Sequence, residues 1–130
     1  MTAMLHTILI VDDSTLMQQM YRLSLARYQG TRLVSALNGA EGLEVLAREP
    51  VVDLILLDIN MPMMNGLEML GRVKHTAQYQ KIPVIVITSQ GSETDKQRCL
   101  KLGARACLQK PFSLPELCRL IEEVAREKSS

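Results

Sequence analysis

Five residues with charged or hydroxyl side chains follow short, mostly apolar runs of the chain. An unbroken apolar run such as Leu54–Leu57 is typical of a strand that is covered on both faces of a parallel sheet. The residues that follow these runs are two neighbouring acids, a third acid, a hydroxyl and an amine: Asp12, Asp13, Asp58, Thr88 and Lys110. Because parallel strands end at one edge of their sheet, we expect the five side chains to meet there.

Three carboxylates held close together repel one another, and a bound cation relieves that repulsion. Mg²⁺ suits such a place, because it takes one or two carboxylates, keeps several waters and bridges to phosphate oxygens. The backbone carbonyl of Asn60, two residues beyond the third acid, can supply a further oxygen. The sequence therefore predicts a Mg²⁺ site formed by Asp12, Asp13, Asp58 and Asn60.

A cation at this edge places Asp58 as a nucleophile toward phosphorus. The metal and the ammonium group of Lys110 would offset charge on the transferred group, and the hydroxyl of Thr88 can donate a hydrogen bond to a phosphoryl oxygen. We therefore predict that Asp58 accepts a phosphoryl group, with Thr88 and Lys110 assisting the reaction.

Each of these residues also has a simpler interpretation. Asp12 and Asp13 suit the positive end of a helix dipole, Thr88 can merely end a strand, and Lys110 can be a solvated surface amine. Asn65–Gly66 is interpreted as turn chemistry alone. The position of the whole set at strand ends favours the shared site.

Strand and helix patterns alternate five times along the chain. The first helix is predicted from Ser14, its N-cap, to about Tyr28, and Gly30 closes it. Its helical spacing comes from Leu16, Met17, Met20 and Leu23. Asn38 with Glu41 and Ser113 with Glu116 predict capping boxes for two later helices. Five such units predict an α/β fold with a parallel sheet and right-handed crossovers.

The helix predicted over Ser92–Leu102 has a thin apolar stripe, mainly Cys99 and Leu102. Such a helix gains little from packing, so we expect it to be loosely held.

Composition narrows the class of protein. The 130 residues are 47% hydrophobic and 22% charged, which suits one globular domain over residues 1–130. Lys and Arg number 15 against 14 Asp and Glu, a balance that indicates neither nucleic acid nor a membrane surface as partner. No run approaches the roughly 20 apolar residues of a membrane span, and the N-terminus does not resemble a signal peptide. Three unpaired cysteines without C-x-x-C spacing fit a reduced, cytoplasmic protein.

Four segments in this order and spacing resemble the receiver domain of two-component response regulators, of the stand-alone, chemotaxis (CheY-like) type. They are IVDD at Ile10–Asp13, LLDINMPMMNG at Leu56–Gly66, VIVITS at Val84–Ser89 and KPF at Lys110–Phe112. The resemblance implies a flavodoxin-like (βα)5 fold, a doubly wound five-stranded parallel sheet with strand order 2-1-3-4-5. The chemotaxis regulator is itself a standard example of that order.

The resemblance also implies roles. Asp58 would be the phosphoacceptor, Lys110 would pair with the phosphoryl group and precede a cis proline bond, and Thr88 would move on activation. The metal would be Mg²⁺ on Asp12, Asp13, Asp58 and the Asn60 carbonyl. The phosphoryl donor would be a sensor histidine kinase or a histidine phosphotransfer protein, and a downstream protein would read the output. We expect a monomer or weak dimer, and no turnover of a separate substrate.

One position departs from the receiver pattern, because Cys107 stands where receivers usually carry Tyr or Phe. A small thiol cannot swing into and out of a pocket as a ring does, so the readout on the last three elements would differ. This departure favours a second hypothesis, a receiver-fold interaction module that does not depend on phosphorylation. A third hypothesis, an aspartyl-nucleophile hydrolase of the haloacid dehalogenase type, would require an acid where Asn60 stands.

Overall fold

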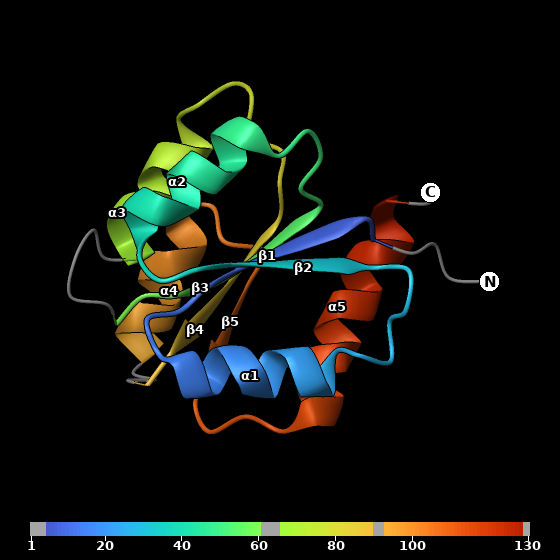
Figure 1. The fold of residues 1–130 in the computed structure, drawn as a ribbon. Coiled ribbons are helices and arrows are strands. Elements are labelled where there is room, and N and C mark those ends of the chain that lie inside the picture. Colours follow the sequence, from blue (N-terminus) through green and yellow to red (C-terminus); the bar gives the residue numbers. More distant parts are fainter. Residues whose placement is uncertain (1–4, 61–65, 90–92, 129–130) are drawn as a thin grey trace.

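A computed structural model of the chain describes residues 5–60, 66–89 and 93–128. The strands form one parallel sheet in the order β2-β1-β3-β4-β5 (Figure 1). The elements in chain order are β1 (Thr7–Val11), α1 (Thr15–Ser24), β2 (Arg32–Ala36), α2 (Gly39–Arg48), β3 (Leu54–Asp58), α3 (Gly66–Lys74), β4 (Val84–Thr88), α4 (Glu93–Lys101), β5 (Ala106–Gln109) and α5 (Leu114–Lys128). The predicted fold class and strand order are confirmed.

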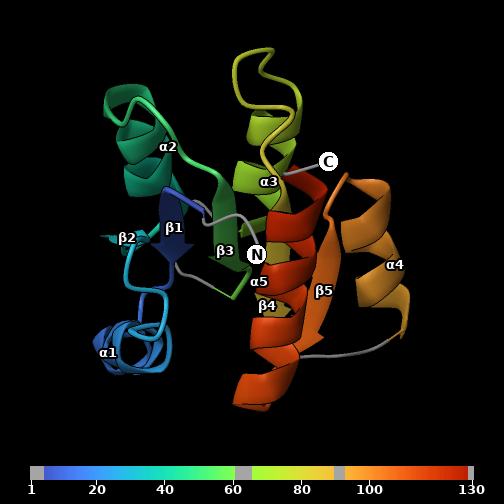
Figure 2. The same cartoon turned by 90° about the vertical axis from the view of Figure 1, so that its right-hand side faces the viewer.

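Helices cover both faces of the sheet. α1 and α5 lie on one face, and α2, α3 and α4 lie on the other (Figures 1 and 2). The three inner strands, β1, β3 and β4, are consequently buried at every position, whereas the edge strands β2 and β5 are partly exposed. The double cover explains why the inner strands are apolar on both faces.

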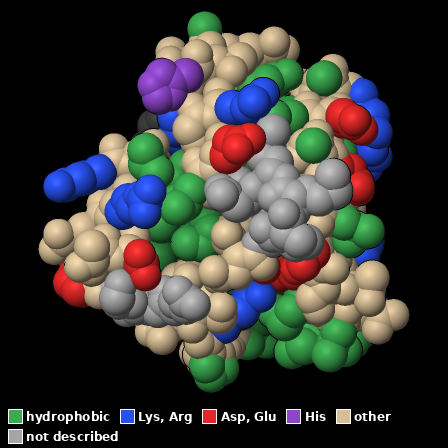
Figure 3. Space-filling view, turned by 90° about the vertical axis from the view of Figure 1, so that its left-hand side faces the viewer, with side chains coloured by type: hydrophobic (Ala, Val, Ile, Leu, Met, Phe, Trp, Pro, Cys, Tyr) green, Lys and Arg blue, Asp and Glu red, His purple; other side chains and the backbone are tan. Residues whose placement is uncertain are grey.

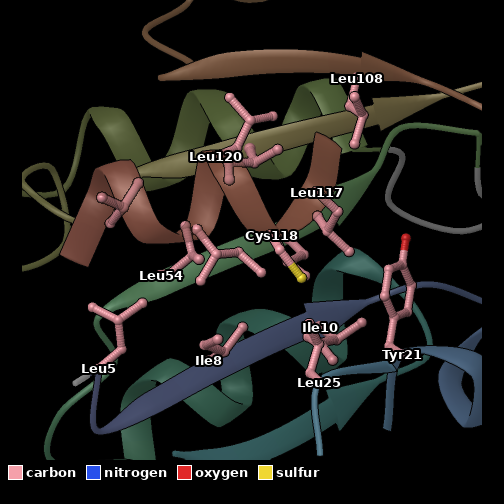
Figure 4. Close-up of a cluster of buried hydrophobic side chains, with 14 of the residues drawn as sticks. Leu5, Ile8, Ile10, Tyr21, Leu25, Leu54, Leu108, Leu117, Cys118 and Leu120 are labelled. Carbon is pink, nitrogen blue, oxygen red and sulfur yellow. The ribbon is translucent and has the colours of Figure 1, made fainter. Parts of the chain in front are cut away.

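The side chains of successive strand residues belong to two separate hydrophobic clusters, one on each face of the sheet. Figure 4 shows the first, in which Ile8, Ile10 and Leu54 pack with Leu117 and Leu120 of α5. The second cluster takes the alternate strand residues together with α2, α3 and α4, and includes Leu9, Val11, Ile55, Leu57, Val86, Met69, Leu70 and Cys99. Helices therefore pack against both faces of the sheet, and this packing fixes the position of the carboxyl ends of the strands.

The N-cap side chain of each predicted cap accepts its expected backbone hydrogen bond. Ser14 Oγ accepts a hydrogen bond from Met17 N at 3.1 Å, and Asn38 Oδ1 accepts one from Glu41 N at 2.8 Å. Ser113 Oγ accepts one from the backbone N–H three residues on, at 3.2 Å. Each cap satisfies a backbone donor that has no partner within its helix.

The prediction for the first helix was wrong in two respects. α1 ends at Ser24 rather than near Tyr28, and Gly30 does not close it. Beyond Ser24 the chain turns, with Tyr28 N donating to Leu25 O at 3.0 Å, so that both side chains pack in the first cluster. The residues at helical spacing that face solvent are Leu16, Met20 and Leu23, while the buried residues of α1 are Gln18 and Tyr21.

The thin stripe predicted for the helix before β5 is confirmed, since Cys99 is the buried residue of α4. α4 is followed by Gly103, whose φ of 105° lies in the left-handed region that favours glycine. Asn65, one of the two predicted turn residues, lies outside the described residues. No helix within residues 5–60, 66–89 and 93–128 has the length and apolar character to cross a bilayer.

Candidate functional site

The strand register aligns the predicted site residues side by side at the carboxyl edge of the sheet. Val11 pairs with Leu57, so the residues that follow them, Asp12 and Asp58, are neighbours. Asp58 pairs with Ile87, the residue before Thr88, and Thr88 pairs with Gln109, the residue before Lys110. The backbone continues this alignment, because Lys110 N donates to Thr88 O at 2.7 Å.

Three carboxylates and one amine converge at this edge. Asp12, Asp13 and Asp58 each offer an oxygen within 4.8 Å of the others. Lys110 Nζ lies 3.3 Å from Asp12 Oδ2 and 3.5 Å from Asp58 Oδ2. Figure 3 views the molecule from this edge and shows acidic and basic side chains adjoining. The structure therefore brings together the acids and the amine that the sequence placed at separate strand ends.

The site is more buried on one side than on the other. Asp12 and Asp58 are 1% and 4% exposed, whereas Asp13 is exposed to solvent. Burial raises the pKa of Asp12 above that of a free aspartate, and the nearby charge of Asp58 adds to this rise. The hydrogen bond from Ser14 N to Asp12 Oδ1, at 2.9 Å, and the ammonium group of Lys110 oppose it. A positive charge beside Asp12 would offset both the burial of its carboxylate and the repulsion from Asp58.

Asn60 ties the loop after β3 to the end of β4. Its backbone N–H donates to Asp58 Oδ1 at 2.8 Å. Its side-chain Oδ1 accepts hydrogen bonds from Ser89 N at 3.0 Å, Ser89 Oγ at 3.1 Å and Thr88 Oγ1 at 3.4 Å. The sequence predicted a role for the Asn60 carbonyl alone, so this side-chain bridge was missed. It connects the hydroxyl of Thr88 to the loop that follows Asp58.

Gly66 lies against the end of β3, a contact that the turn interpretation did not predict. A Cβ built on Gly66 would lie 2.4 Å from Ile59 Cα and 2.6 Å from Asp58 O, both backbone atoms. Only a residue without a side chain allows the start of α3 to approach β3 so closely. Glycine beside Asn often marks a turn, but the close approach itself depends on the path of the chain and has no sequence signal.

The donor set fits a hard divalent cation. Carboxylate oxygens are the ligands that Mg²⁺ prefers, and Asp12, Asp13 and Asp58 supply them around one space. The side of the site at Asp13 is open to solvent, which leaves room for the waters that Mg²⁺ retains.

Two further features lie on β5 and directly after it. The peptide bond between Lys110 and Pro111 is cis, as the resemblance implied. Cys107 is half-buried and packs in the second cluster together with Cys99 of α4, so a thiol fills the position that is usually aromatic. Burial raises the pKa of both thiols, that of Cys99 to about 11.

Comparison with known proteins identifies the class that this fold and site define. The sequence matches the family model of the response regulator receiver domain over residues 8–122. The chain therefore belongs to the response regulator receiver family, whose members are phosphoacceptor signalling domains.

Curated relatives include both long and short proteins. A chemotaxis protein CheY homolog of Campylobacter jejuni is 32% identical over 117 residues, covering 90% of each chain. A probable cyclic di-GMP phosphodiesterase of Vibrio cholerae is 40% identical over 124 residues, which is 95% of this chain but only 27% of that protein. The chain thus spans about a quarter of one relative and nearly all of the other.

Solved structures show the same fold. Chemotaxis protein CheY4 of Vibrio cholerae superposes with a TM-score of 0.83 at 32% identity, covering 92% of this chain and 98% of that one. A CheY-like receiver domain protein of Methanospirillum hungatei gives 0.84 at 30% identity, covering 97% and 99%. The receiver domain is CheY-like in sequence and in structure.

Proposed function

We propose that Asp58 accepts a phosphoryl group in a Mg²⁺-dependent reaction and that this event controls the binding of a downstream protein. The observation that carries the proposal is the convergence of Asp12, Asp13 and Asp58 with Lys110 at one sheet edge. Membership of the receiver family supports the same chemistry.

The reaction is a transfer from a phosphohistidine. A carboxylate oxygen of Asp58 forms the new bond to phosphorus as the P–N bond to the imidazole of the donor breaks. Asp12, Asp13, Asp58 and the Asn60 carbonyl would hold Mg²⁺. That ion, when bound, supplies positive charge beside the transferred group. Lys110 adds a second positive charge, and the hydroxyl of Thr88 donates to a phosphoryl oxygen.

The output is a change at α4, β5 and α5. A phosphoryl oxygen competes with Asn60 Oδ1 for the hydroxyl of Thr88, which now lies 3.4 Å from that amide oxygen. Movement of Thr88 acts on β5 through the bond between Thr88 O and Lys110 N. α4 is the helix most easily displaced, since Cys99 is its buried residue. Contact between Cys107 and Cys99 passes the change to α4 without an aromatic ring.

The donor is a sensor histidine kinase or a histidine phosphotransfer protein that docks beside the site. α1 begins at Thr15, with its N-cap Ser14 next to Asp13, and it exposes Leu16, Met20 and Leu23 at helical spacing. Hydrophobic side chains gather over α1 at the lower right of Figure 3, on the same view as the acids. An exposed apolar helix face next to the reacting carboxylate suits a protein donor.

Incubation with acetyl phosphate and Mg²⁺, followed by intact mass measurement, tests the proposal. We expect one base-labile phosphoryl group, which is lost in Asp58→Asn and after removal of Mg²⁺ by EDTA. Glu44→Gln, which neutralises an exposed acid of α2, is the matched control and should be labelled like the wild type.

The other outcomes support other functions. No adduct on the folded wild-type protein would contradict the proposal and favour a phosphorylation-independent interaction module, which the thiol at position 107 also favours. Multiple turnover of an added phosphomonoester would indicate a hydrolase instead.

A further inference from the structure

Gln18 lies on the buried face of α1 and bonds to three backbone carbonyls at the ends of β1 and β2. Its Nε2 lies 3.1 Å from the carbonyl oxygens of Ile10, Asp12 and Ala36. The residue is 6% exposed. Because a glutamine amide has two N–H groups, the three acceptors share two hydrogens.

The surroundings fix the direction of the amide. In the reverse orientation Oε1 would face three acceptors and gain no hydrogen bond from any of them. In the observed orientation Oε1 is buried and, within the described part of the chain, has no hydrogen-bond partner. Gln18 therefore acts here as a donor, and its acceptor oxygen is not used.

The bonds of Gln18 hold the backbone of Asp12, one of the three converging acids. Asp12 stands one residue beyond the last pairs of β1, so its carbonyl has no donor from the strand ladder. Gln18 supplies that donor, and the N–H of Asp12 donates to Ala36 O at 3.0 Å, the same carbonyl that Gln18 binds. With Ser14 N on Oδ1, the residue is held at its N–H, its carbonyl and one carboxylate oxygen.

We infer that Gln18 is a positioning residue for the cation site, acting through the backbone of Asp12. The inference rests on the proposed function, because it takes Asp12 to be a ligand of Mg²⁺. Without the amide donors, the carbonyl of Asp12 loses its partner and the peptide plane after Asp12 can rotate. The carboxylate then spends less time in the space it shares with Asp13 and Asp58. Mutation of a residue that holds a metal ligand in place typically lowers metal affinity about 10–100-fold.

The test compares Gln18→Met, which keeps the side-chain length but removes both donors, with Gln19→Met on the exposed side of the same helix. Mg²⁺ alone is titrated calorimetrically into each unphosphorylated protein. We expect the dissociation constant to rise about tenfold or more in Gln18→Met and to stay unchanged in Gln19→Met. Phosphorylation by acetyl phosphate should slow at low Mg²⁺ and return close to the wild-type rate at saturating Mg²⁺.

A purely structural role predicts something different, a lower unfolding temperature with unchanged Mg²⁺ affinity while the protein remains folded. That result would overturn the inference and leave the proposed function intact. A wild-type protein that binds no Mg²⁺ would overturn both. Should Gln18→Met fail to fold, Gln18→Asn, whose amide is one methylene shorter, serves in its place, and wild-type affinity in that variant would equally overturn the inference.

Discussion

The ammonium nitrogen of Lys110 lies 3.5 Å from Asp58 Oδ2, although 52 residues separate the two in the chain. The same nitrogen is 3.3 Å from Asp12 Oδ2. Lys110 therefore already offsets carboxylate charge before any cation or phosphoryl group arrives. It has two effects of opposite sign, since its charge repels a bound cation and stabilises a transferred phosphoryl group.

Removal of the amine should separate these two effects. In Lys110→Met the dissociation constant for Mg²⁺ should fall, because a positive charge next to two of the proposed ligands is gone. Phosphorylation by acetyl phosphate at saturating Mg²⁺ should slow by about 10²-fold, the range seen when one preorganised donor is lost. Calorimetry and intact mass measure the two quantities.

The matched control for this pair of measurements is Lys101→Met, an exposed lysine of α4, for which neither quantity should change. Weaker Mg²⁺ binding in Lys110→Met would contradict the account, since it would mean that Lys110 holds the acids in place rather than repelling the cation.

Gly66 and Gly71, both in α3, should respond in opposite ways to alanine. In Gly66→Ala the new Cβ meets the backbone of Asp58 and Ile59 at 2.6 and 2.4 Å, so β3 or α3 must shift. We expect a loss of about 1–3 kcal/mol in the free energy of unfolding and slower phosphorylation, because Asp58 moves. Gly71 has nothing within 4 Å of its Cβ position, and Gly71→Ala should stabilise by about 0.5–1 kcal/mol.

Urea unfolding of the two variants side by side measures the difference. Equal stability of Gly66→Ala and the wild type would show that the contact between α3 and the end of β3 relaxes without strain.

The meeting of Asp12, Asp58 and Lys110 could be predicted from sequence because two simple rules suffice. Unbroken apolar runs indicate inner strands of a parallel sheet, and parallel strands end at one edge. The functional roles of these residues stay predictions, since convergence alone does not show reaction.

Other features could not be predicted, because they depend on which face of an element is buried and how the chain approaches itself. Periodicity in α1 correctly indicated a helix, but it favoured Leu16, Met20 and Leu23, which are exposed. The buried face instead carries polar Gln18, whose burial is compensated by carbonyls that hydropathy does not reveal. The bridge from Asn60 to Ser89 likewise joins two loops whose paths no local pattern encodes.

The exposed apolar face of α1 should matter for protein donors and not for small ones. Leu16 and Leu23 are 66% and 79% exposed, so a polar replacement leaves the core untouched. In Leu16→Gln/Leu23→Gln we expect transfer from a phosphorylated histidine phosphotransfer protein to slow by about tenfold, the effect of roughly 1.4 kcal/mol of lost docking energy. The rate with acetyl phosphate should not change.

Val51→Gln is the control for the α1 variant, because Val51 is 47% exposed and lies before β3, at the opposite end of that strand from Asp58. Equal slowing with both donors would place the defect in the site itself and not in docking.

Cys99 of α4 and Cys107 of β5 should make the folded protein less stable at alkaline pH. Burial, with the neighbouring Cys107, raises the pKa of Cys99 from 9.0 to about 11. Between these values the unfolded chain loses the thiol proton while the folded chain keeps it, so the free energy of unfolding falls as pH rises. Below pH 9 this contribution is fully present. Urea unfolding between these two pH values should show a shallower decline of the free energy of unfolding in Cys99→Ala/Cys107→Ala than in the wild type. Val73→Ala, in the same cluster, is the control and should keep the wild-type slope. Equal slopes in all three proteins would contradict the assignment.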